Sequence, residues 1–191
     1  ANHLVTQGIE IILNPSASHF AFEKEKYREQ LVVSSSKKFN CTYLYTNLLG
    51  NEAGRMIYDG DILIAQNGNL IGHNTRFSFK PFNILYCEVD FDRQTSSTNL
   101  KKDYTGKLEE MSQALPLALF DYLIKSKNKG FVLSLSGGAD SSTIAIMVRR
   151  MVDLAIQELG IATVRKRLKL PTTLKNAKDI MASLMVTAYQ G

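Results

Sequence analysis

The chain has 191 residues, of which 45% are hydrophobic and 21% are charged, a composition typical of a globular protein rather than a disordered one. No run of about eighteen apolar residues is present, so we predict no membrane-spanning helix and no membrane partner. The net charge of +5 is modest, and by itself it gives no reason to expect a nucleic acid partner.

The cysteines, the histidines and the first residues indicate the setting of the protein. Cys41 and Cys87 are far apart and match no metal or redox spacing, so we interpret both as buried structural cysteines in a reduced, cytoplasmic protein. His3 and His73 lack ligand-like neighbours, and we expect them at the surface. The opening ANHLVTQGIEII has neither an initiator Met nor a secretory pattern, and we interpret the chain as internal sequence of a longer protein.

Residues 1–92 have the pattern of a strand-rich region with one helix. The helix is expected at 22–39, with charges on one side and Leu31 and Val32 on the other. Asn67-Gly68 lies between two apolar runs and predicts a hairpin with a type I′ turn, because both turn positions need a positive φ. We predict strands at 9–13, ending at the breaker pair Asn14-Pro15, at 41–47, at 61–66 and 70–74 around the turn, and at 84–91.

The pattern changes after residue 92. Residues 93–106 are polar and without periodicity, which is typical of a linker. Residues 107–130 have the apolar spacing of an amphipathic helix, with Pro116 near its first turn. The next predicted elements are a strand at 131–136, a helix at 139–160 ending at Gly160, and a last helix from about 174 to 189.

A run of six Lys and Arg residues lies between Arg165 and Lys178. Leucines and alanine interrupt the run, and it contains no aromatic residue on which a base would stack. We therefore interpret it as a solvated helical or loop surface and predict no nucleic acid partner.

The sequence LSLSGGADSS at 133–142 places two glycines between an apolar strand and a helix. Gly137 and Gly138 let the backbone turn sharply and let a bulky anion approach bare N–H groups. The new helix directs unpaired N–H donors and the positive end of its dipole at the same place. Ser136, Ser141 and Ser142 add hydroxyl donors, so the segment predicts a cradle for phosphate.

This segment is not a Walker loop, whose lysine and spacing are absent. Asp140 stands where a Walker loop is most cationic, and a carboxylate beside phosphates is explained if it binds Mg²⁺. The competing interpretation is that Ser136 and Asp140 only cap a helix and that the glycines form an ordinary turn.

The string S-G-G-x-D-S-S between a strand and a helix resembles the signature of the ATP pyrophosphatases, which cleave ATP between the α- and β-phosphates. The resemblance implies that Asp140 is a Mg²⁺ ligand. It also implies an ATP site lined by Ser134, Leu135, Ser136, Gly137, Gly138, Ala139, Asp140 and Ser141.

Residues 1–92 resemble the C-terminal part of a nitrilase-type amidase, through NPSASHF (14–20), YLYTNLLG (43–50) and DGDILIAQNGNLIG (59–72). An amidase of this type ahead of a pyrophosphatase domain is the architecture of glutamine-dependent NAD+ synthetase. The stretches 112–148 and 178–191 are also similar to that family.

The resemblance implies an α/β fold, with part of a nitrilase-like αββα sandwich at 1–92, a linker at 93–106, and the start of a Rossmann-like ATP-pyrophosphatase domain (an adenine nucleotide alpha hydrolase) at 107–191. It implies a ligase that converts deamido-NAD+ to NAD+ with ammonia from glutamine, through an adenylate, releasing AMP and pyrophosphate. Its small-molecule partners are glutamine, ATP and deamido-NAD+, and we further expect a homo-oligomer.

Within the amidase half, Ser18 and Lys24 match the family positions that contact glutamine, with a loop serine and a solvated lysine as the competing interpretation. The family's Glu-Lys-Cys triad is expected upstream, so no catalytic residue is predicted in this chain. Cys87-Glu88 imitates the family's Cys-Glu pair but falls downstream of NPSASHF, inside an expected strand.

Two other functions remain open from the sequence. One is another ATP-pyrophosphatase ligase, similar to GMP synthetase or to a tRNA-modifying enzyme. The other is a non-catalytic nucleotide-binding module. By itself, the segment is expected to be inactive.

Overall fold

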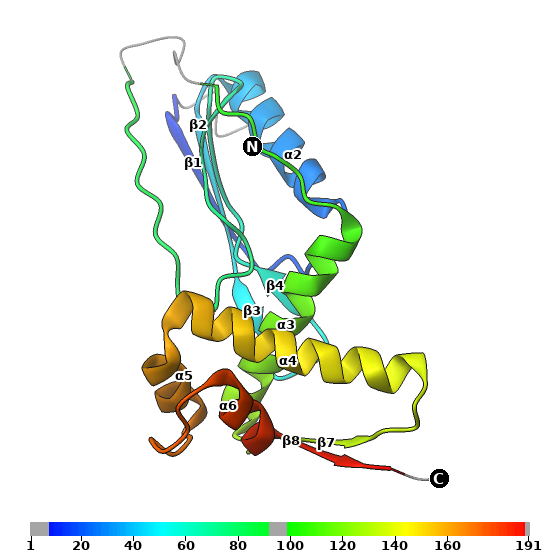
Figure 1. Ribbon diagram of the computed structural model, residues 1–191. Helices are drawn as coiled ribbons and strands as arrows, with labels where there is room; N and C mark the ends of the chain where they lie inside the picture. Colours follow the sequence, from blue (N-terminus) through cyan, green and yellow to red (C-terminus); the bar gives the residue numbers. More distant parts are fainter. Residues whose placement is uncertain (1–7, 92–98, 190–191) are drawn as a thin grey trace. The chain divides into compact units, whose positions relative to one another are not determined.

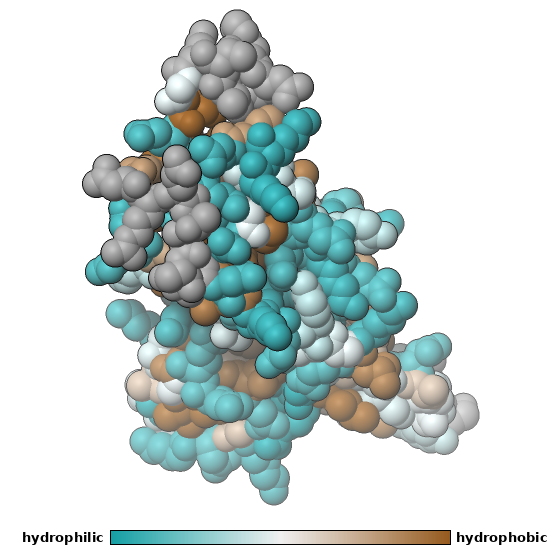
Figure 2. Space-filling view, turned by 90° about the horizontal axis from the view of Figure 1, so that it is seen from above, coloured by the Kyte–Doolittle hydropathy of each residue, from teal (hydrophilic) through white to brown (hydrophobic). Residues whose placement is uncertain are grey.

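The computed structural model describes residues 8–91 and 99–189, which form two compact units (Figure 1). Unit 1 takes its described residues from 1–49, 58–76 and 82–107, and unit 2 takes them from 50–57, 77–81 and 108–191. The face shown in Figure 2 is mostly hydrophilic, with separate hydrophobic patches. Among the described residues, no helix has the length and apolar character that a membrane span requires.

Unit 1 is built on a mixed four-stranded sheet in the order β1-β2-β5-β6. β1 (Ile11–Ser16) and β2 (Thr42–Asn47) are parallel, while β5 (Ile62–Gln66) and β6 (Asn69–His73) continue the sheet with antiparallel pairings. The helix α2 (Lys24–Phe39) connects the two parallel strands and lies along one face of the sheet (Figure 1). Parallel neighbours need such a crossover, because a tight turn cannot join them. Two short strands, β3 (Leu49–Asn51) and β4 (Ile57–Asp59), pair with each other.

The core of unit 1 lies between α2 and the sheet. The side chains of Val32, Leu63 and Ala65 are fully buried, and Tyr45 and Leu70 complete the cluster. Because successive strand residues point to opposite faces, Leu63 and Ala65 reach the same side of β5 as the helix. The hydrophobic pattern therefore fixes the register that places the loops at the end of the sheet.

The predicted hairpin is confirmed. β5 and β6 pair around Asn67 and Gly68, whose φ angles are +49° and +91°. Both turn residues therefore occupy the left-handed region that a type I′ turn demands.

Two of the strand predictions in unit 1 are wrong in extent or type. β1 does not end at Asn14-Pro15 but continues to Ser16. Pro15 is compatible with the strand because β1 is at the edge of the sheet, where a missing N–H breaks no ladder on the open side. Residues 84–91 alternate in exposure, with Tyr86 88% exposed, but they form no strand, because no ladder of backbone hydrogen bonds joins them to the described part of the sheet.

Unit 2 contains most of the helices. Its elements are α3 (Lys107–Ser126), β7 (Phe131–Ser134), α4 (Ala139–Leu159), α5 (Ile161–Leu168), α6 (Ala177–Leu184) and β8 (Met185–Ala188). β7 and β8 form a parallel pair, from Phe131 opposite Met185 to Ser134 opposite Ala188. A buried layer of Val148, Met151 and Val152 on α4 faces the interior of this unit.

Two helix predictions in unit 2 need correction. Pro116 does not lie near the first turn of its helix but well inside α3, where its ring is buried. The helix predicted at 174–189 ends at Leu184, and residues 185–188 are the strand β8. Pairing with β7 decides this conformation, because Val186 and Thr187 are β-branched and fit a pleated surface.

A close backbone approach at Gly130 joins β7 to the end of α6. A Cβ atom at this position would lie 2.3 Å from the carbonyl oxygen of Leu184. We expect Gly130→Ala to lower the free energy of unfolding by about 1–3 kcal/mol, because backbone must move to accept the methyl group. Chemical denaturation measures this change.

Gly106→Ala is the matched control, because a Cβ atom there would meet no heavy atom within 4 Å. Equal stability of the two variants would contradict the close approach between Gly130 and α6.

Candidate nucleotide and glutamine sites

The loop from β7 to α4 has the conformation that its glycines allow. Gly137 has a φ of +79°, a value that residues with a side chain rarely adopt, and a Cβ atom there would meet open space. Gly138 is the N-cap of α4, with φ −79° and ψ 169°. The chain thus turns from strand into helix within four residues, from Leu135 to Gly138.

The first turn of α4 has no side-chain cap. The Gly138 N–H donates to the Ser136 hydroxyl at 3.4 Å, but neither Ser136 nor Asp140 forms a cap bond to the helix. The structure therefore gives no support to the interpretation of Asp140 as a helix cap, and Ser136 accepts its backbone hydrogen bond from the N-cap residue itself. Uncapped N–H groups at the positive end of the helix dipole favour an external anion.

The serines of the loop differ in their roles. The Oγ atoms of Ser136 and Ser141 are 3.4 Å apart and face each other across the turn. Ser142 and Thr143 instead donate their hydroxyl hydrogens to the carbonyls of Gly138, at 2.9 Å, and Ala139, at 2.7 Å. Ser141 also donates to the Gly138 carbonyl, at 3.3 Å. Of the three serines expected to add donors, Ser136 and Ser141 are the two whose hydroxyls face each other.

Asp140 lies in the exposed first turn of α4. Within residues 8–91 and 99–189, no group of three or more His, Cys, Asp or Glu side chains is placed to hold a metal. A lone carboxylate fits Mg²⁺ better than most metals, because Mg²⁺ keeps several waters and takes its other ligands from phosphate oxygens.

The end of β8 lies directly beside the loop. The Leu135 N–H donates to the Ala188 carbonyl at 2.7 Å, so the parallel pairing extends just past β7. The carboxyl ends of both strands therefore meet at the edge where α4 begins, which is where open α/β sheets bind ligands. This strand lies where the sequence pattern predicts helix, although Met185-Val186-Thr187 has the composition of a strand.

A second loop, in unit 1, carries Ser18 and leads into Lys24, the first residue of α2. The Ser18 N–H donates to Asn47 Oδ1 at 2.8 Å, and Asn47 Nδ2 donates to the Ser18 carbonyl at 2.9 Å. Lys24 Nζ donates to the His19 carbonyl at 2.9 Å. The structure thus places Ser18 on a short, anchored loop and Lys24 at the start of the helix that follows, with the Lys24 ammonium bonded back to the loop.

Comparisons with known proteins find relatives of the chain. Residues 111–190 match the family model described as NAD synthase. A glutamine-dependent NAD(+) synthetase from Arabidopsis thaliana is 28% identical over 194 residues, covering 82% of this chain and 27% of that protein. The crystal structure of a glutamine-dependent NAD(+) synthetase from Cytophaga hutchinsonii is 45% identical, with a TM-score of 0.81, covering 97% of this chain and 32% of that one.

The chain is therefore similar to glutamine-dependent NAD(+) synthetases over most of its length. It spans about a third or less of the length of these relatives. A synthetase structure from Acinetobacter baumannii, solved with ADP, is 19% identical with a TM-score of 0.66 and shows the same fold. The expected α/β class is confirmed at this level, and so is the predicted resemblance to glutamine-dependent NAD+ synthetases.

The two cysteines lie in surroundings that favour the protonated thiol. Burial raises the pKa of the Cys41 thiol. Burial and the adjacent Glu88 carboxylate raise the pKa of Cys87, whose sulfur also donates to the Ile71 carbonyl at 3.5 Å. A nucleophilic cysteine needs the opposite shift, because the thiolate is the reactive form. His73 is half-buried, not at the surface as expected, and His3 lies outside the described residues.

Part of the basic run between Arg165 and Lys178 is not solvated, contrary to the prediction. Arg165 is half-buried and donates to the carbonyls of Thr172, at 2.8 Å, and Leu174, at 2.7 Å. Arg167 is half-buried over the ring of Phe120, and burial lowers its pKa. These two arginines therefore hold the helices of unit 2 in place, whereas Lys166 and its exposed neighbours are solvated as expected.

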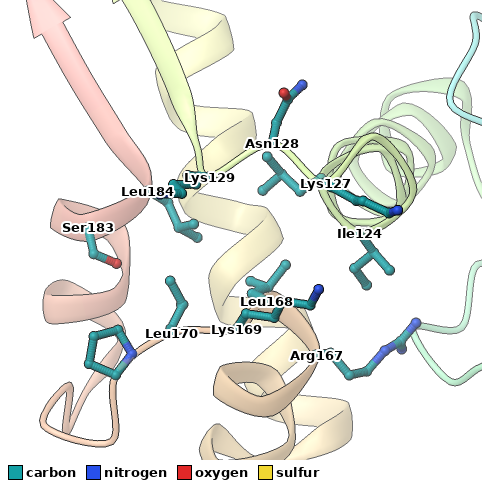
Figure 3. Close-up of a pocket in the computed structure, with 12 residues that line it drawn as sticks. Ile124, Lys127, Asn128, Lys129, Arg167, Leu168, Lys169, Leu170, Ser183 and Leu184 are labelled. Carbon is teal, nitrogen blue, oxygen red and sulfur yellow. The ribbon is translucent and has the colours of Figure 1, made fainter.

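A cavity of about 520 Å³ lies among the ends of α3, α5 and α6 (Figure 3). Leu168, Leu170 and Leu184 contribute apolar walls, and Lys127 and Lys129 add positive charge. None of the predicted ATP residues lines this cavity, so it is separate from the β7–α4 loop.

The raised thiol pKa values predict slow alkylation. We expect iodoacetamide to label Cys41 and Cys87 of the native protein at neutral pH far more slowly than in denaturant, because the folded state disfavours both thiolates. Labelling rises only as the pH increases above the ordinary thiol range. Peptide mass spectrometry follows each cysteine separately, and rapid native labelling of Cys87 at neutral pH would show it to be a reactive thiol instead.

Proposed function

We propose that the intact protein amidates deamido-NAD+ to NAD+ with ammonia released from glutamine. The observation that carries the proposal is the uncapped N-terminus of α4, which follows a glycine turn at Gly137 and adjoins the ends of two parallel strands. The similarity to named NAD+ synthetases supports the choice of substrate. The ADP in the Acinetobacter baumannii structure supports an adenine nucleotide as the ligand.

In this proposal the β7–α4 loop binds the phosphates of ATP. Backbone N–H groups near Gly137 and Gly138 and the hydroxyls of Ser136 and Ser141 donate to phosphate oxygens. The full proposed lining is Ser134, Leu135, Ser136, Gly137, Gly138, Ala139, Asp140 and Ser141. Asp140 holds Mg²⁺, which when bound neutralises phosphate charge.

The chemistry requires positioning and charge stabilisation more than covalent help from the protein. The carboxylate of deamido-NAD+ attacks the α-phosphorus of ATP and displaces pyrophosphate, which the loop retains. Ammonia then attacks the carbonyl carbon of the adenylate, and AMP leaves with one of the original carboxylate oxygens. Preorganised N–H groups stabilise the negative charge that develops on the phosphate oxygens.

In the amidase half we propose that Ser18 and Lys24 contact glutamine. Ser18 hydrogen-bonds the substrate, and the Lys24 ammonium pairs with its carboxylate. The Glu-Lys-Cys triad that releases ammonia is proposed to lie upstream of this chain, with a thioester forming on its cysteine.

The finer architecture is part of the same proposal. Residues 1–92 would belong to a nitrilase-like sandwich, 93–106 to a linker, and 107–191 to a Rossmann-like pyrophosphatase domain. The sheet of unit 1 with α2 and the strand, loop and helix of unit 2 support this division. The compact units differ from it by grouping 50–57 and 77–81 with unit 2 and 99–107 with unit 1. A homo-oligomer in the cytoplasm completes the proposal.

The intact protein tests the proposed reaction directly. Glutamine, ATP, Mg²⁺ and deamido-NAD+ together should yield NAD+, and omission of deamido-NAD+ should abolish ATP–pyrophosphate exchange. Exchange triggered by another acceptor, such as a xanthine nucleotide or a tRNA, would assign a different ligase of the pyrophosphatase group. Nucleotide binding without exchange would indicate a non-catalytic module.

Asp140→Asn tests the proposed magnesium ligand. The amide keeps the size of the side chain but removes its charge, so we expect ATP–pyrophosphate exchange to fall by about 100-fold and to need more Mg²⁺. Exchange measured over a Mg²⁺ titration checks this.

Asp153→Asn, on the same helix, is the matched control, because Asp153 is exposed and pairs with Arg149 instead of facing the loop. Unchanged exchange and Mg²⁺ dependence in the Asp140 variant would remove that residue from the site.

A further inference from the structure

Unit 1 contains a buried network of three acidic and three basic side chains. The solvent-exposed fraction of each of these side chains is at most 6%. The members are Glu25, Arg28, Asp59, Asp61, Arg76 and Lys102. Because buried charge is tolerated only when it is paired, these groups must hold one another in a defined arrangement.

Lys102 closes one end of the network. Its Nζ atom lies 2.7 Å from Glu25 Oε1 and 2.9 Å from Asp61 Oδ1. Burial raises the pKa of Asp61, and Lys102 opposes that shift most strongly. Without Lys102, Asp61 would lose its nearest cation. Glu25 would lose one of its ion-pair partners and keep Arg76.

Arg28 forms the other end and faces the predicted glutamine loop. It pairs with Asp59 and lies 3.7 Å from Asp61 Oδ2. Its Nη2 atom also donates to the Ser18 carbonyl at 2.9 Å and to the Ser18 hydroxyl at 3.3 Å. One guanidinium group therefore ties the acidic cluster to the main chain and side chain of Ser18.

Asn47 fastens the same loop from the strand β2. It exchanges hydrogen bonds with the N–H and carbonyl of Ser18 and donates to Asp59 Oδ1 at 2.6 Å. Ser18 is thus held by two side chains, Arg28 and Asn47, and both are anchored on Asp59.

Lys102 comes from the segment that the sequence assigns to a linker. The described part of that segment is docked along unit 1, because the Leu100 N–H donates to the Leu70 carbonyl at 2.8 Å. The Tyr104 hydroxyl donates to Glu29 on α2 at 2.7 Å, and burial together with this hydrogen bond raises its pKa. The hydrogen bonds of Leu100 and Tyr104 therefore hold the chain on both sides of Lys102 and keep its ammonium group in the network.

We propose that Arg28 and Lys102 are positioning residues for glutamine. Arg28 fixes Ser18 directly, and Lys102 fixes Arg28 through the carboxylate of Asp61, which contacts both cations. The inference rests on the proposed function, in which Ser18 contacts glutamine. A site must hold its contact groups within about half an ångström, so displacement of Ser18 weakens glutamine binding before it affects a distant site.

The experiment uses the intact synthetase and two amine donors. Ammonium salts supply ammonia without the amidase, so NAD+ formation from ammonium reports on the synthetase alone. We expect Arg28→Lys to raise the KM for glutamine by about 10-fold, since lysine lacks the planar fork that reaches Asp59 and Ser18 together. Ammonium-dependent activity should not change.

Lys102→Met is the second variant, with Lys101→Met as its exposed matched control. We expect the KM for glutamine to rise several-fold in Lys102→Met, to recover in Lys102→Arg and to stay at the wild-type value in Lys101→Met. Asn47→Ala removes the uncharged one of the two side chains that hold Ser18, so the buried charges stay the same. This variant should raise the KM for glutamine even if a variant of a charged residue folds poorly.

The outcomes separate the two proposals. A wild-type protein that makes NAD+ from neither donor defeats the proposed function itself. An active wild-type enzyme with an unchanged KM in Arg28→Lys and Asn47→Ala overturns the positioning role. Loss of glutamine- and ammonium-dependent activity in parallel with a lowered Tm also overturns it, because a purely structural role predicts that pattern.

Discussion

The start of α4 is the constraint on which the proposed function depends. The N-cap residue of the helix is Gly138, so no N-cap side chain is available to accept hydrogen bonds from its first N–H groups. The preceding Gly137 has a positive φ and leaves open space where a side chain would be. A protein that required only a stable helix would gain a few tenths of a kcal/mol from a serine or aspartate in place of this glycine. An exposed, uncapped terminus is instead suited to an anion supplied from outside.

The rest of unit 2 places that terminus. β8 pairs with β7 and continues to the Leu135 N–H, which fixes the strand end from which the loop departs. Buried residues on α4 hold the helix axis, so its first turn stays directed at the end of the strands. In unit 1, by contrast, the loop that carries Ser18 is held by the buried ion pair and hydrogen bond that Arg28 and Asn47 form with Asp59.

Local patterns made part of this structure predictable from sequence. Asn67-Gly68 specifies its turn because both residues tolerate a positive φ, and Gly137-Gly138 specifies the loop for a similar reason. Remote contacts decided the rest. The strand β8 forms because β7 lies beside it, and Lys102 is buried because Glu25 and Asp61 meet it from distant parts of the chain. Periodicity within a short window carries no information about such partners.

The transfer of oxygen from the acceptor to the nucleotide tests the central claim most directly. The intact enzyme would be given deamido-NAD+ labelled with ¹⁸O in its carboxylate, together with ATP, Mg²⁺ and ammonium. Attack of that carboxylate at the α-phosphorus predicts one ¹⁸O atom in the phosphate of the released AMP, which mass spectrometry detects. Unlabelled AMP, or ADP with labelled orthophosphate, would contradict the adenylation that we assign to the β7–α4 loop.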